Sequence, residues 1–482
     1  MTATHVRADG TVLTTSRVAP MTASPVGAMA HRAAVDRLQA SYRAVPEGSP
    51  IRLAKRTSNL FRPRAASATP GLDVTGLGDV ISLDLDHPDG PTADVQGMCT
   101  YERLVATTLA HGHMPRVVPQ LRTITLGGAV TGLGIESSSF RNGLPHESVR
   151  ELDVLTGDGR VVTTTPDGEH ADLFGAFPNS YGTLGYATRL RIELDPVQPY
   201  VRTRNLRFGS LEELTEAIGA IVATRSWHDD PVDFLDGVMF SAEESYLVLG
   251  SWANDRHTAA RLSDYTGGQV YYRSLPERPT DALTVLDYLW RWDTDWFWCS
   301  RAFGAQNPTV RRLWPAALRR SDVYHRLVGL ENRYHVAARI DRRRGLPARE
   351  RVVQDIEVPL ERTASFLRWY LDHVPMTPVW LCPLVGQGTW SLYPLPPGAT
   401  YVNVGFWGTV PIEPGRSDGD VNRLVEQAVS DHHGHKSLYS DAYYTEDDFW
   451  TRYGGQTYPE VKQRYDPDGR LPDLFTKVVG RS

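Results

Sequence analysis

TITLGGAVTGLGIESSSFRNG, residues 123–143, holds five glycines among its twenty-one positions. Glycine weakens the interior of helices and strands, so this many together indicate a turn that something approaches closely. The spacing fits neither G-x-G-x-x-G after a strand nor GxxxxGK(S/T), which excludes the usual dinucleotide fingerprint and the P-loop. We therefore expect a glycine-rich turn whose amides face an anion or a flat ring. A set of turns and bulges in a β domain is the alternative.

The composition is that of an ordinary globular chain. Its 482 residues are 41% hydrophobic and 22% charged, which suffices for two or three domains with substantial cores. The net charge of −6 argues against nucleic acid as a partner. Cys99, Cys299 and Cys382 are too few and too far apart for a disulfide framework or a zinc knuckle. We expect reduced thiols, no metal site and a cytoplasmic location.

The chain divides into four predicted parts, and the predicted fold class is α+β. Residues 1–33 read as a flexible leader, and no stretch of about eighteen apolar residues predicts a membrane span. Residues 34–198 alternate short β-rich runs with a few helical stretches, and GDG at 157–159 predicts a hairpin turn. Residues 199–430 mix strands with helices rich in Arg and Trp, and residues 431–482 are polar and rich in tyrosine.

The sequence around the glycine run resembles the FAD-binding domain of the vanillyl-alcohol-oxidase or PCMH-type flavoproteins. The resemblance rests on VVPQLRTITLGGAVTGLGIESSSFRNGLPHESVRELDVLTGDGRVV followed by DLFGAFPNSYGTLGYATRLRIEL. It implies a PCMH-type FAD-binding domain at 34–198, an α+β substrate or cap domain at 199–430, and a C-terminal segment that returns to the flavin. The cofactor-binding residues that it implies are Pro119, Thr125, Gly127, Gly128, Gly132, Gly134, Ile135, Ser137, Ser138, Gly182, Thr183, Gly185 and Lys462.

The loop LAKRTSNLFRPR, residues 53–64, departs from that family. Many relatives carry an Arg-Gly-Gly-Gly-His type loop here, whose last residue is sometimes linked covalently to the flavin. This loop contains neither His nor Cys, so we expect FAD to bind non-covalently. Thr57, Ser58 and Asn59 are predicted to donate hydrogen bonds to phosphate oxygens. A solvated basic turn is the alternative.

A narrower resemblance runs from roughly residue 50 to the end. PQLRTITLGGAVTGLGIESSS, RVVQDIEVPLERTASFL, PVWLCPL, LYSDAYYTEDDFW and YPEVKQRYDPDGRLPDLF are similar to segments of the Δ24-sterol reductases. The whole chain resembles the actinobacterial flavin reductases that convert 10-methylene fatty acyl chains into 10-methyl chains, the last step toward tuberculostearic acid. This resemblance implies NADPH as electron donor, a fatty acyl phospholipid as substrate, and a methyltransferase acting upstream in the same pathway.

Such a substrate requires a positioned acid. An isolated C=CH2 group has no carbonyl to stabilise a carbanion, so a proton must reach the methylene carbon before or as hydride reaches the branch carbon. Glu136 directly follows the glycine run, and burial there would raise its pKa toward that of a useful acid. Tyr443, with Asp441 in the same stretch, is the competing donor. A structural Glu136 and a tyrosine run that only packs are the alternatives.

The segment DYLWRWDTDWFWCSRAF, residues 287–303, has two interpretations. It holds Trp290, Trp292, Trp296 and Trp298, and a helix carrying Arg311, Arg312, Arg319, Arg320 and Arg326 is expected to follow. Aromatic residues beside cations are typical of proteins that rest at the lipid headgroup layer, which predicts peripheral contact with the inner face of a membrane. The alternative is a helical cap core with a solvated basic face.

Three functions follow from these patterns. The first is an FAD-dependent, NADPH-driven reductase of an isolated C=C bond in a fatty acyl lipid. The second is an oxidase or dehydrogenase of an alcohol, sugar or sterol, since this fold supports many such reactions. The third is a flavin-free lipid-binding protein, against which the intact glycine run argues.

Overall fold

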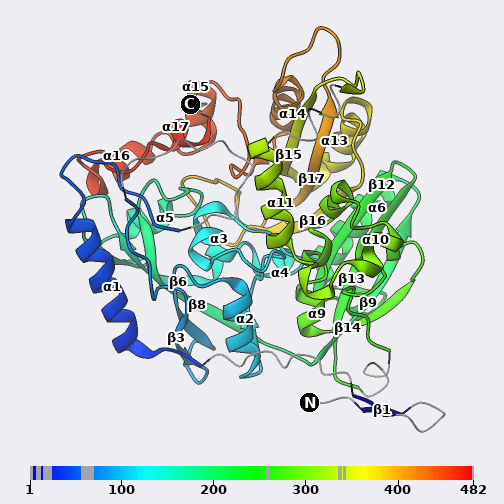
Figure 1. Ribbon diagram of the computed structural model, residues 1–482, viewed down its shortest axis with the longest axis horizontal. Helices are drawn as coiled ribbons and strands as arrows, with labels where there is room; N and C mark the ends of the chain where they lie inside the picture. The colour runs from blue at the N-terminus through cyan, green and yellow to red at the C-terminus, as the bar shows by residue number, and fades with distance from the viewer. Residues whose placement is uncertain are drawn as a thin grey trace.

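Two antiparallel sheets organise the chain (Figure 1). The computed structural model describes residues 4–6, 12–14, 24–55, 70–255, 258, 261–334, 339 and 343–479. The first sheet, the blue to green-cyan half of Figure 1, is built from residues 80–196, and the second from residues 200–436. The largest hydrophobic cluster contains buried residues of both sheets, so one continuous core joins them. The predicted α+β class is confirmed.

The first sheet has the strand order β3-β4-β8-β6-β7, and β5 pairs with β8. The hairpin predicted at GDG is confirmed, because β6 and β7 pair on either side of it and Gly159 has a φ of 85°. The strands are β3 (Val80–Asp84), β4 (Thr92–Gln96), β5 (His113–Pro115), β6 (Val149–Leu155), β7 (Val161–Thr164) and β8 (Tyr186–Pro196).

Short helices pack around this sheet. In α2 the Thr100 side chain accepts the Arg103 N–H, which caps the helix, and the apolar stripe of Tyr101, Leu104 and Val105 is buried. The helix α1 begins at Gly27, inside the predicted leader, and the leader also holds the ribbon of β1 (Thr4–Val6) and β2 (Val12–Thr14). The helices are α1 (Gly27–Arg43), α2 (Tyr101–Leu109), α3 (Leu126–Gly132), α4 (Ser139–Asn142), η1 (Pro145–Ser148) and α5 (Ala171–Ala176).

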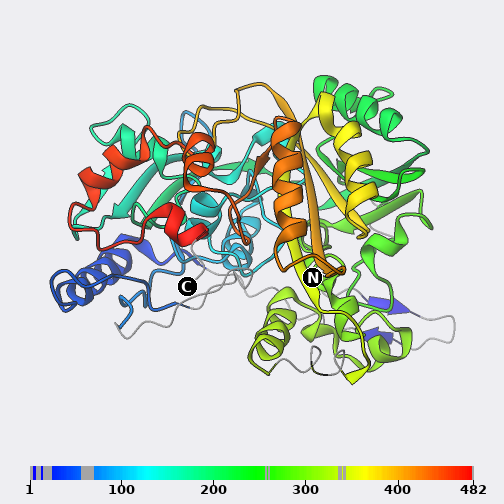
Figure 2. The same ribbon diagram turned by 90° about the horizontal axis from the view of Figure 1, so that it is seen from above.

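The second sheet has eight strands in the order β14-β9-β13-β12-β16-β17-β15-β18. The strands are β9 (Tyr200–Phe208), β12 (Phe234–Ser241), β13 (Glu244–Ala253), β14 (Thr280–Thr284), β15 (Arg349–Pro359), β16 (Val379–Val385), β17 (Thr400–Pro411) and β18 (His435–Lys436). The ribbon of β10 (Ser226–Trp227) and β11 (Asp230–Pro231) lies beside it. We call the face covered by α6 (Leu211–Thr224), α13 (Leu360–His373) and α14 (Asp420–Asp431) the outer face (Figure 2).

Strand β15 shows how the two faces of this sheet differ. Val352, Ile356 and Val358 join the cluster under the helices of the outer face, whereas Val353 joins the core shared with the first sheet. Since successive residues of a strand point to opposite faces, odd-numbered positions of β15 lie on the inner face, toward the first sheet. The functional site is built there.

The tryptophan segment packs as core. Trp290, Trp292, Trp296 and Trp298 are at most 5% exposed, so their side chains do not form the membrane-facing aromatic surface of the first interpretation. The core half of the alternative interpretation is confirmed for the tryptophans. The solvated basic face is wrong for Arg311 and Arg319, which are 1% and 7% exposed, and Arg311 pairs with Asp295. The elements of this region are α8 (Tyr271–Ser274), α9 (Val285–Leu289), η2 (Asp293–Asp295), η3 (Cys299–Phe303), α10 (Pro308–Leu313), η4 (Ala316–Leu318) and α11 (Ser321–Tyr334).

The C-terminal segment returns to the first half of the molecule, as its red ribbon beside α5 shows in Figure 1. It forms α15 (Glu446–Arg452), α16 (Tyr458–Tyr465) and α17 (Leu474–Val478). None of the described helices combines the length and the apolar character needed to cross a membrane.

Candidate active site

The glycine run is partly helical, which corrects the predicted turn. Leu126–Gly132 form α3, and the Thr125 hydroxyl caps it by accepting the Gly128 N–H at 3.2 Å. The glycines are tolerated because the helix lies against other backbone. A Cβ on Gly127 would stand 2.7 Å from the Gly97 carbonyl oxygen, and one on Gly132 would stand 3.3 Å from the Tyr181 ring. The glycines are therefore explained by close approach, as predicted. What comes close is other backbone and a tyrosine ring, and the glycines lie in a helix as well as in a turn.

The structure brings several of the predicted cofactor-binding residues together. A Cβ on Gly134 would lie 3.0 Å from Pro119 and 3.1 Å from Pro145, so the chain after α3 is held between two prolines. Ile135 packs partly buried on the shared core, and the Ser138 hydroxyl donates to the Arg116 carbonyl. Residues 131–135 lie deep in the molecule yet keep part of their surface accessible.

A second predicted stretch closes on the end of α3. Tyr181 donates its hydroxyl to the Gly132 carbonyl at 2.9 Å, and its backbone N–H donates to Thr131. Gly182 and Gly185 follow with φ values of 75° and 139°, a backbone that residues with side chains rarely adopt. The Lys462 ammonium donates to the Thr183 carbonyl at 2.9 Å, which fastens α16 to this turn. Thr57, Ser58 and Asn59 lie outside the described residues.

Glu136 sits in a buried network with a cation at its centre. The carboxylate accepts the Ser137 N–H at 2.7 Å and the Ser137 hydroxyl, and it lies 3.7 Å from the Arg291 guanidinium. Arg291 pairs with Asp236 at 2.9 Å and stacks 3.9 Å from the centre of the Tyr288 ring. Burial raises the pKa of Glu136 to about 7, and Arg291 opposes the rise. The predicted direction of this pKa shift is confirmed.

Tyr443 and Asp441 lie elsewhere. Asp441 forms an ion pair with Arg351 at 2.9 Å. The Tyr443 N–H donates to Glu426 of α14, and the Arg423 guanidinium lies 4.9 Å from the centre of its ring. Arg351 precedes Asp355 by four residues on β15, about 13 Å along the strand. These contacts place the two predicted donors toward α14 and the start of β15 rather than beside Glu136.

The inner face of β15 carries an acid pair that the sequence analysis missed. Asp355 and Glu357 are two residues apart on this strand and share its inner face. Asp355 accepts from the Asn403 amide at 3.2 Å and from the Tyr439 hydroxyl, while Glu357 accepts from the Tyr393 and Ser437 hydroxyls. Removal from water raises the pKa of Asp355 to about 7 and that of Glu357 well above its ordinary value. The acidic D-x-E spacing in the apolar strand QDIEV was the available signal.

Several buried polar atoms around the site lack hydrogen-bond partners. Gln120 is 3% exposed, yet neither of its side-chain amide atoms has a hydrogen-bond partner. The Glu136 Oε2, Asp236 Oδ1 and Asn403 Oδ1 atoms are also buried without partners. Because buried polar groups are almost always satisfied, these atoms fit a polar ring system bound between the glycine segment and the inner face. Within the described ranges, no three His, Cys, Asp or Glu side chains converge as a metal ion would require.

The comparisons with known proteins agree with this arrangement. Residues 33–165 match the family model described as an FAD binding domain. The chain is 25% identical over 421 residues to the Δ24-sterol reductase of Homo sapiens, covering 83% of this chain and 76% of that protein. It is 24% identical over 453 residues to the Δ24-sterol reductase of Arabidopsis thaliana.

A shorter match concerns a different activity. Cytokinin dehydrogenase 7 of Oryza sativa subsp. japonica is 30% identical over 178 residues, which cover 36% of this chain and 34% of that protein. The glycine segment and the turn at residues 181–185 meet as the expected FAD-binding domain requires, and the family model supports FAD as the cofactor. The chain is therefore an FAD-dependent oxidoreductase with a PCMH-type FAD-binding domain, distantly related to the Δ24-sterol reductases.

Proposed function

We propose that this flavoprotein uses NADPH to reduce an isolated C=C bond in a lipid. The proposed substrate is a phospholipid-bound 10-methylene-stearoyl chain, and the product is the 10-methyl-stearoyl chain of tuberculostearic acid. The similarity to proteins named as reductases over 83% of the chain supports the reaction class. The substrate is proposed from the narrower resemblance of the segments quoted above.

The observation that carries the reaction class is the set of buried carboxyl groups around the glycine segment. A carboxyl with a pKa of about 7, as at Glu136 and Asp355, keeps a proton at neutral pH and can still give it up. Non-covalently bound FAD, once reduced by NADPH, would supply the hydride. The protein would supply the proton to the methylene carbon and exclude water from the branch carbon while positive charge develops there.

The cofactor would be held by residues that already lie together. Thr125, the glycines of α3 and Gly134 would face it from one stretch, and Gly182 and Thr183 from another. Lys462 would hold that second stretch in place through the Thr183 carbonyl rather than touch the ring. We keep Thr57, Ser58 and Asn59 as proposed phosphate ligands.

We further propose that the enzyme is cytoplasmic and draws its substrate from the inner face of a membrane, after an upstream methyltransferase has made the methylene group. Val310, Leu313 and Leu318, around α10 and η4, are 39%, 80% and 45% exposed, and Arg312 beside them is also exposed. Exposed leucines beside an arginine fit a surface of anionic lipid. In this proposal, the exposed side chains of α10 and η4 contact the membrane in place of the tryptophans expected from the sequence.

An alternative function is oxidation of an alcohol, sugar or sterol. The similarity of part of the chain to a protein named as a dehydrogenase favours it. A dehydrogenase needs a base to take a proton from its substrate, and a carboxyl with a pKa of about 7 can serve in either direction.

An anaerobic titration separates the two functions. NADPH would be added to the purified protein while the flavin absorbance is followed, and vesicles of phospholipid bearing a 10-methylene acyl chain would be added next. We expect the flavin to bleach with NADPH and to recover with the lipid, with one 10-methyl chain formed per flavin. Bleaching by NADPH without recovery on lipid would exclude the proposed substrate, whereas bleaching by an alcohol or sterol alone would favour the dehydrogenase.

A further inference from the structure

The acid pair on β15 differs from the Glu136 network in its electrostatic surroundings. Glu136 and Asp236 share the buried cation of Arg291, which opposes the rise that burial causes in the pKa of Glu136. The hydrogen-bond donors to Asp355 and Glu357 in the described part of the chain are amide and hydroxyl groups: Asn403, Tyr439, Tyr393 and Ser437. Burial, with neutral donors, favours the protonated forms of these two carboxyl groups, which share one face of the strand.

Hydrogen bonds and one electrostatic contact, between Tyr439 and Tyr181, link this pair to the glycine segment. The Tyr439 hydroxyl donates to Asp355 and accepts the Trp407 indole N–H at 2.8 Å. Tyr439 also lies close enough to Tyr181 for the two phenols to interact electrostatically. Tyr181 in turn donates to the Gly132 carbonyl at 2.9 Å. The tyrosine of LYSDAYYT that reaches toward the predicted flavin site is therefore Tyr439, not Tyr443.

Partial exposure inside the molecule supports access to this path. Asp355, Tyr439 and Tyr181 keep part of their surface accessible, as residues 131–135 do, although each packs against buried residues. The neighbouring inner-face residues Asn403 and Glu357 are fully buried. In the proposed relay, these partly accessible groups are the ones that a substrate would contact.

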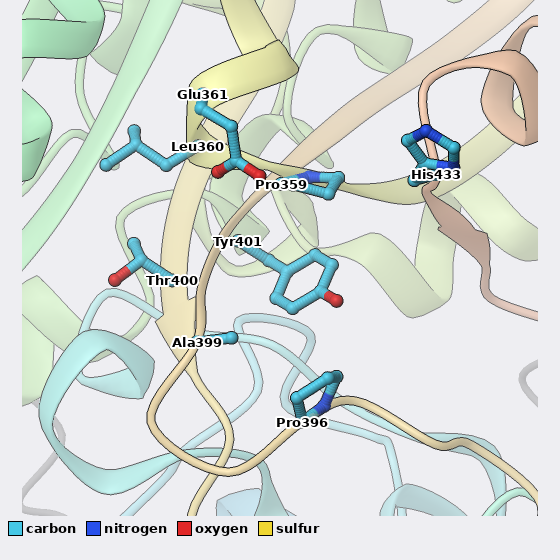
Figure 3. A pocket seen from close by; sticks show the side chains of 8 residues that line it. All are labelled: Pro359, Leu360, Glu361, Pro396, Ala399, Thr400, Tyr401 and His433. Carbon is cyan, nitrogen blue, oxygen red and sulfur yellow. The ribbon is translucent and has the colours of Figure 1, made fainter.

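The other end of the pair approaches the surface. A pocket of about 520 Å³ opens at the end of β15 and is lined by Pro359, Leu360, Glu361, Pro396, Ala399, Thr400, Tyr401 and His433. Figure 3 shows the Tyr401 ring pointing into this pocket, with His433 across from it. Tyr401 lies within electrostatic reach of Glu357, which precedes Pro359 by two residues. Glu357 itself is fully buried, so the pocket brings solvent as far as Tyr401.

We propose that Glu357, Asp355 and Tyr439 form a proton relay that runs from this pocket to the substrate alkene, with the Tyr439 hydroxyl as the group that touches the substrate. The relay rests on the proposed reductase function. The Tyr439 proton bonds to the methylene carbon through the π electron pair, and the Asp355 carboxyl proton replaces it on the phenol oxygen. The branch carbon receives the hydride that the reduced flavin supplies. Glu357 reprotonates Asp355 and takes one proton from solvent at the pocket.

Hydroxyl and carboxyl variants test the relay against matched buried controls. Tyr439→Phe and Asp355→Asn would be compared with Tyr370→Phe and Glu350→Gln. Tyr370 and Glu350 lie under the outer face, where their partners are the Met376 carbonyl and the amides of Val421 and Asn422. We expect the two relay variants to retain FAD and to be reduced by NADPH at the wild-type rate. Their single-turnover reoxidation by 10-methylene lipid should fall by about 100-fold or more, and that of the controls by less than threefold.

The pH dependence of the reoxidation rate is a second measurement, which would not change if Asp355 had only a structural role. The titratable groups around Asp355 are Glu357 on its own strand, Cys382 on β16, and Tyr439 with Tyr181 behind it. In the wild type the reoxidation rate should fall as the pH rises above about 7, and Asp355→Asn should abolish this dependence. If Asp355→Asn shows the same pH dependence of the reoxidation rate as the wild type, the relay is wrong.

The outcomes separate the relay from the proposed function. If the wild type reduces the lipid and Tyr439→Phe does so within threefold of it, the relay is wrong and the reductase stands. If the wild type reduces no 10-methylene lipid, infrared difference spectra of the FAD-bound protein still test the acid pair. A protonated-carboxyl C=O band at neutral pH that is missing in Asp355→Asn supports the pair, and absence of that band from the wild type overturns it.

Discussion

At the residue scale, Arg291 is the buried cation between two carboxyl groups. It is fully buried, pairs with Asp236, and lies 3.7 Å from Glu136, while Asp236 also accepts the indole N–H groups of Trp292 and Trp380. A buried cation that serves two carboxylates is costly to remove, because the carboxylates stay behind without compensation.

We expect Arg291→Met to lower the free energy of unfolding by about 3–5 kcal/mol, which is the usual cost of breaking a buried ion pair from one side. The measurement is urea denaturation followed by tryptophan fluorescence. The double variant Arg291→Met with Asp236→Asn should recover part of the loss, because the uncompensated charge is then reduced. A single variant as stable as the exposed control Arg312→Ala would contradict this account of the network.

Asp355 predicts a pH dependence of stability. Its pKa is about 7 in the folded protein and ordinarily 3.8, so the folded state holds a proton that the unfolded state loses. The stabilising contribution is complete below about pH 4 and is lost as the pH rises to about 7, at about 1.4 kcal/mol per pH unit. Stability of the wild type should therefore decrease over this window, and Asp355→Asn should flatten the curve. Equal slopes for the two proteins would show that Asp355 is charged at neutral pH.

Individual site residues were partly predictable. Glu136 could be found because it directly follows the glycine run, and its burial raises its pKa as expected. Asp355 and Glu357 were missed, because two acids in an apolar strand indicate a site only once the sheet face that they share is known to be covered.

At the element scale, α3 shows how packing overrides helix propensity. Three of its seven residues are glycine, which an isolated helix would disfavour. Contact with the Gly97 backbone and the Tyr181 ring leaves no space for side chains, so the helix exists only against these neighbours. The glycine composition predicted close approach correctly, but local sequence carries no information on the partner backbone.

Gly127→Ala tests this contact. Alanine in place of a helical glycine ordinarily stabilises by up to about 1 kcal/mol. Here the new Cβ would stand 2.7 Å from the Gly97 oxygen, so we expect a loss of about 1–3 kcal/mol from overpacking. FAD affinity, measured by recovery of flavin fluorescence on dilution, should fall in parallel. Gly209→Ala is the matched control, because a Cβ there meets nothing within 4 Å.

The strands were the most predictable elements. The β-rich runs of residues 34–198 and the strands expected within 199–430 include β8 and β15, and both pair along most of their length. The tryptophan segment was harder to interpret, because the same aromatic residues suit a membrane interface or a core. The structure decides between a membrane interface and a core, because the tryptophan side chains are buried beside the inner face of the second sheet.

At the scale of the whole molecule, the site exists because three distant parts of the chain meet. The glycine segment comes from the first sheet, Asp355 from the second, and Tyr439 from the segment after β18. Lys462 then ties α16 to the turn at Thr183 with a partly buried ammonium that also pairs with Asp466. Neither composition nor periodicity could predict these contacts between distant parts of the chain. The family resemblance implied only that the C-terminal segment returns toward the first part of the molecule.

The exposed apolar side chains of α10 and η4 allow a test of the proposed membrane contact. The net charge of −6 would repel an anionic membrane at long range, so the proposed binding requires a local surface. Leu313→Asp replaces the most exposed leucine, at 80%, with a charge of the wrong sign beside Arg312. We expect it to reduce co-sedimentation with phosphatidylglycerol vesicles several-fold while leaving NADPH-driven bleaching of the flavin unchanged. Met29→Asp, on α1 at the opposite end of Figure 1, alters an 85% exposed side chain and should leave vesicle binding unchanged. Equal loss in both variants would mean that general hydrophobicity, and not this surface, holds the protein at the lipid.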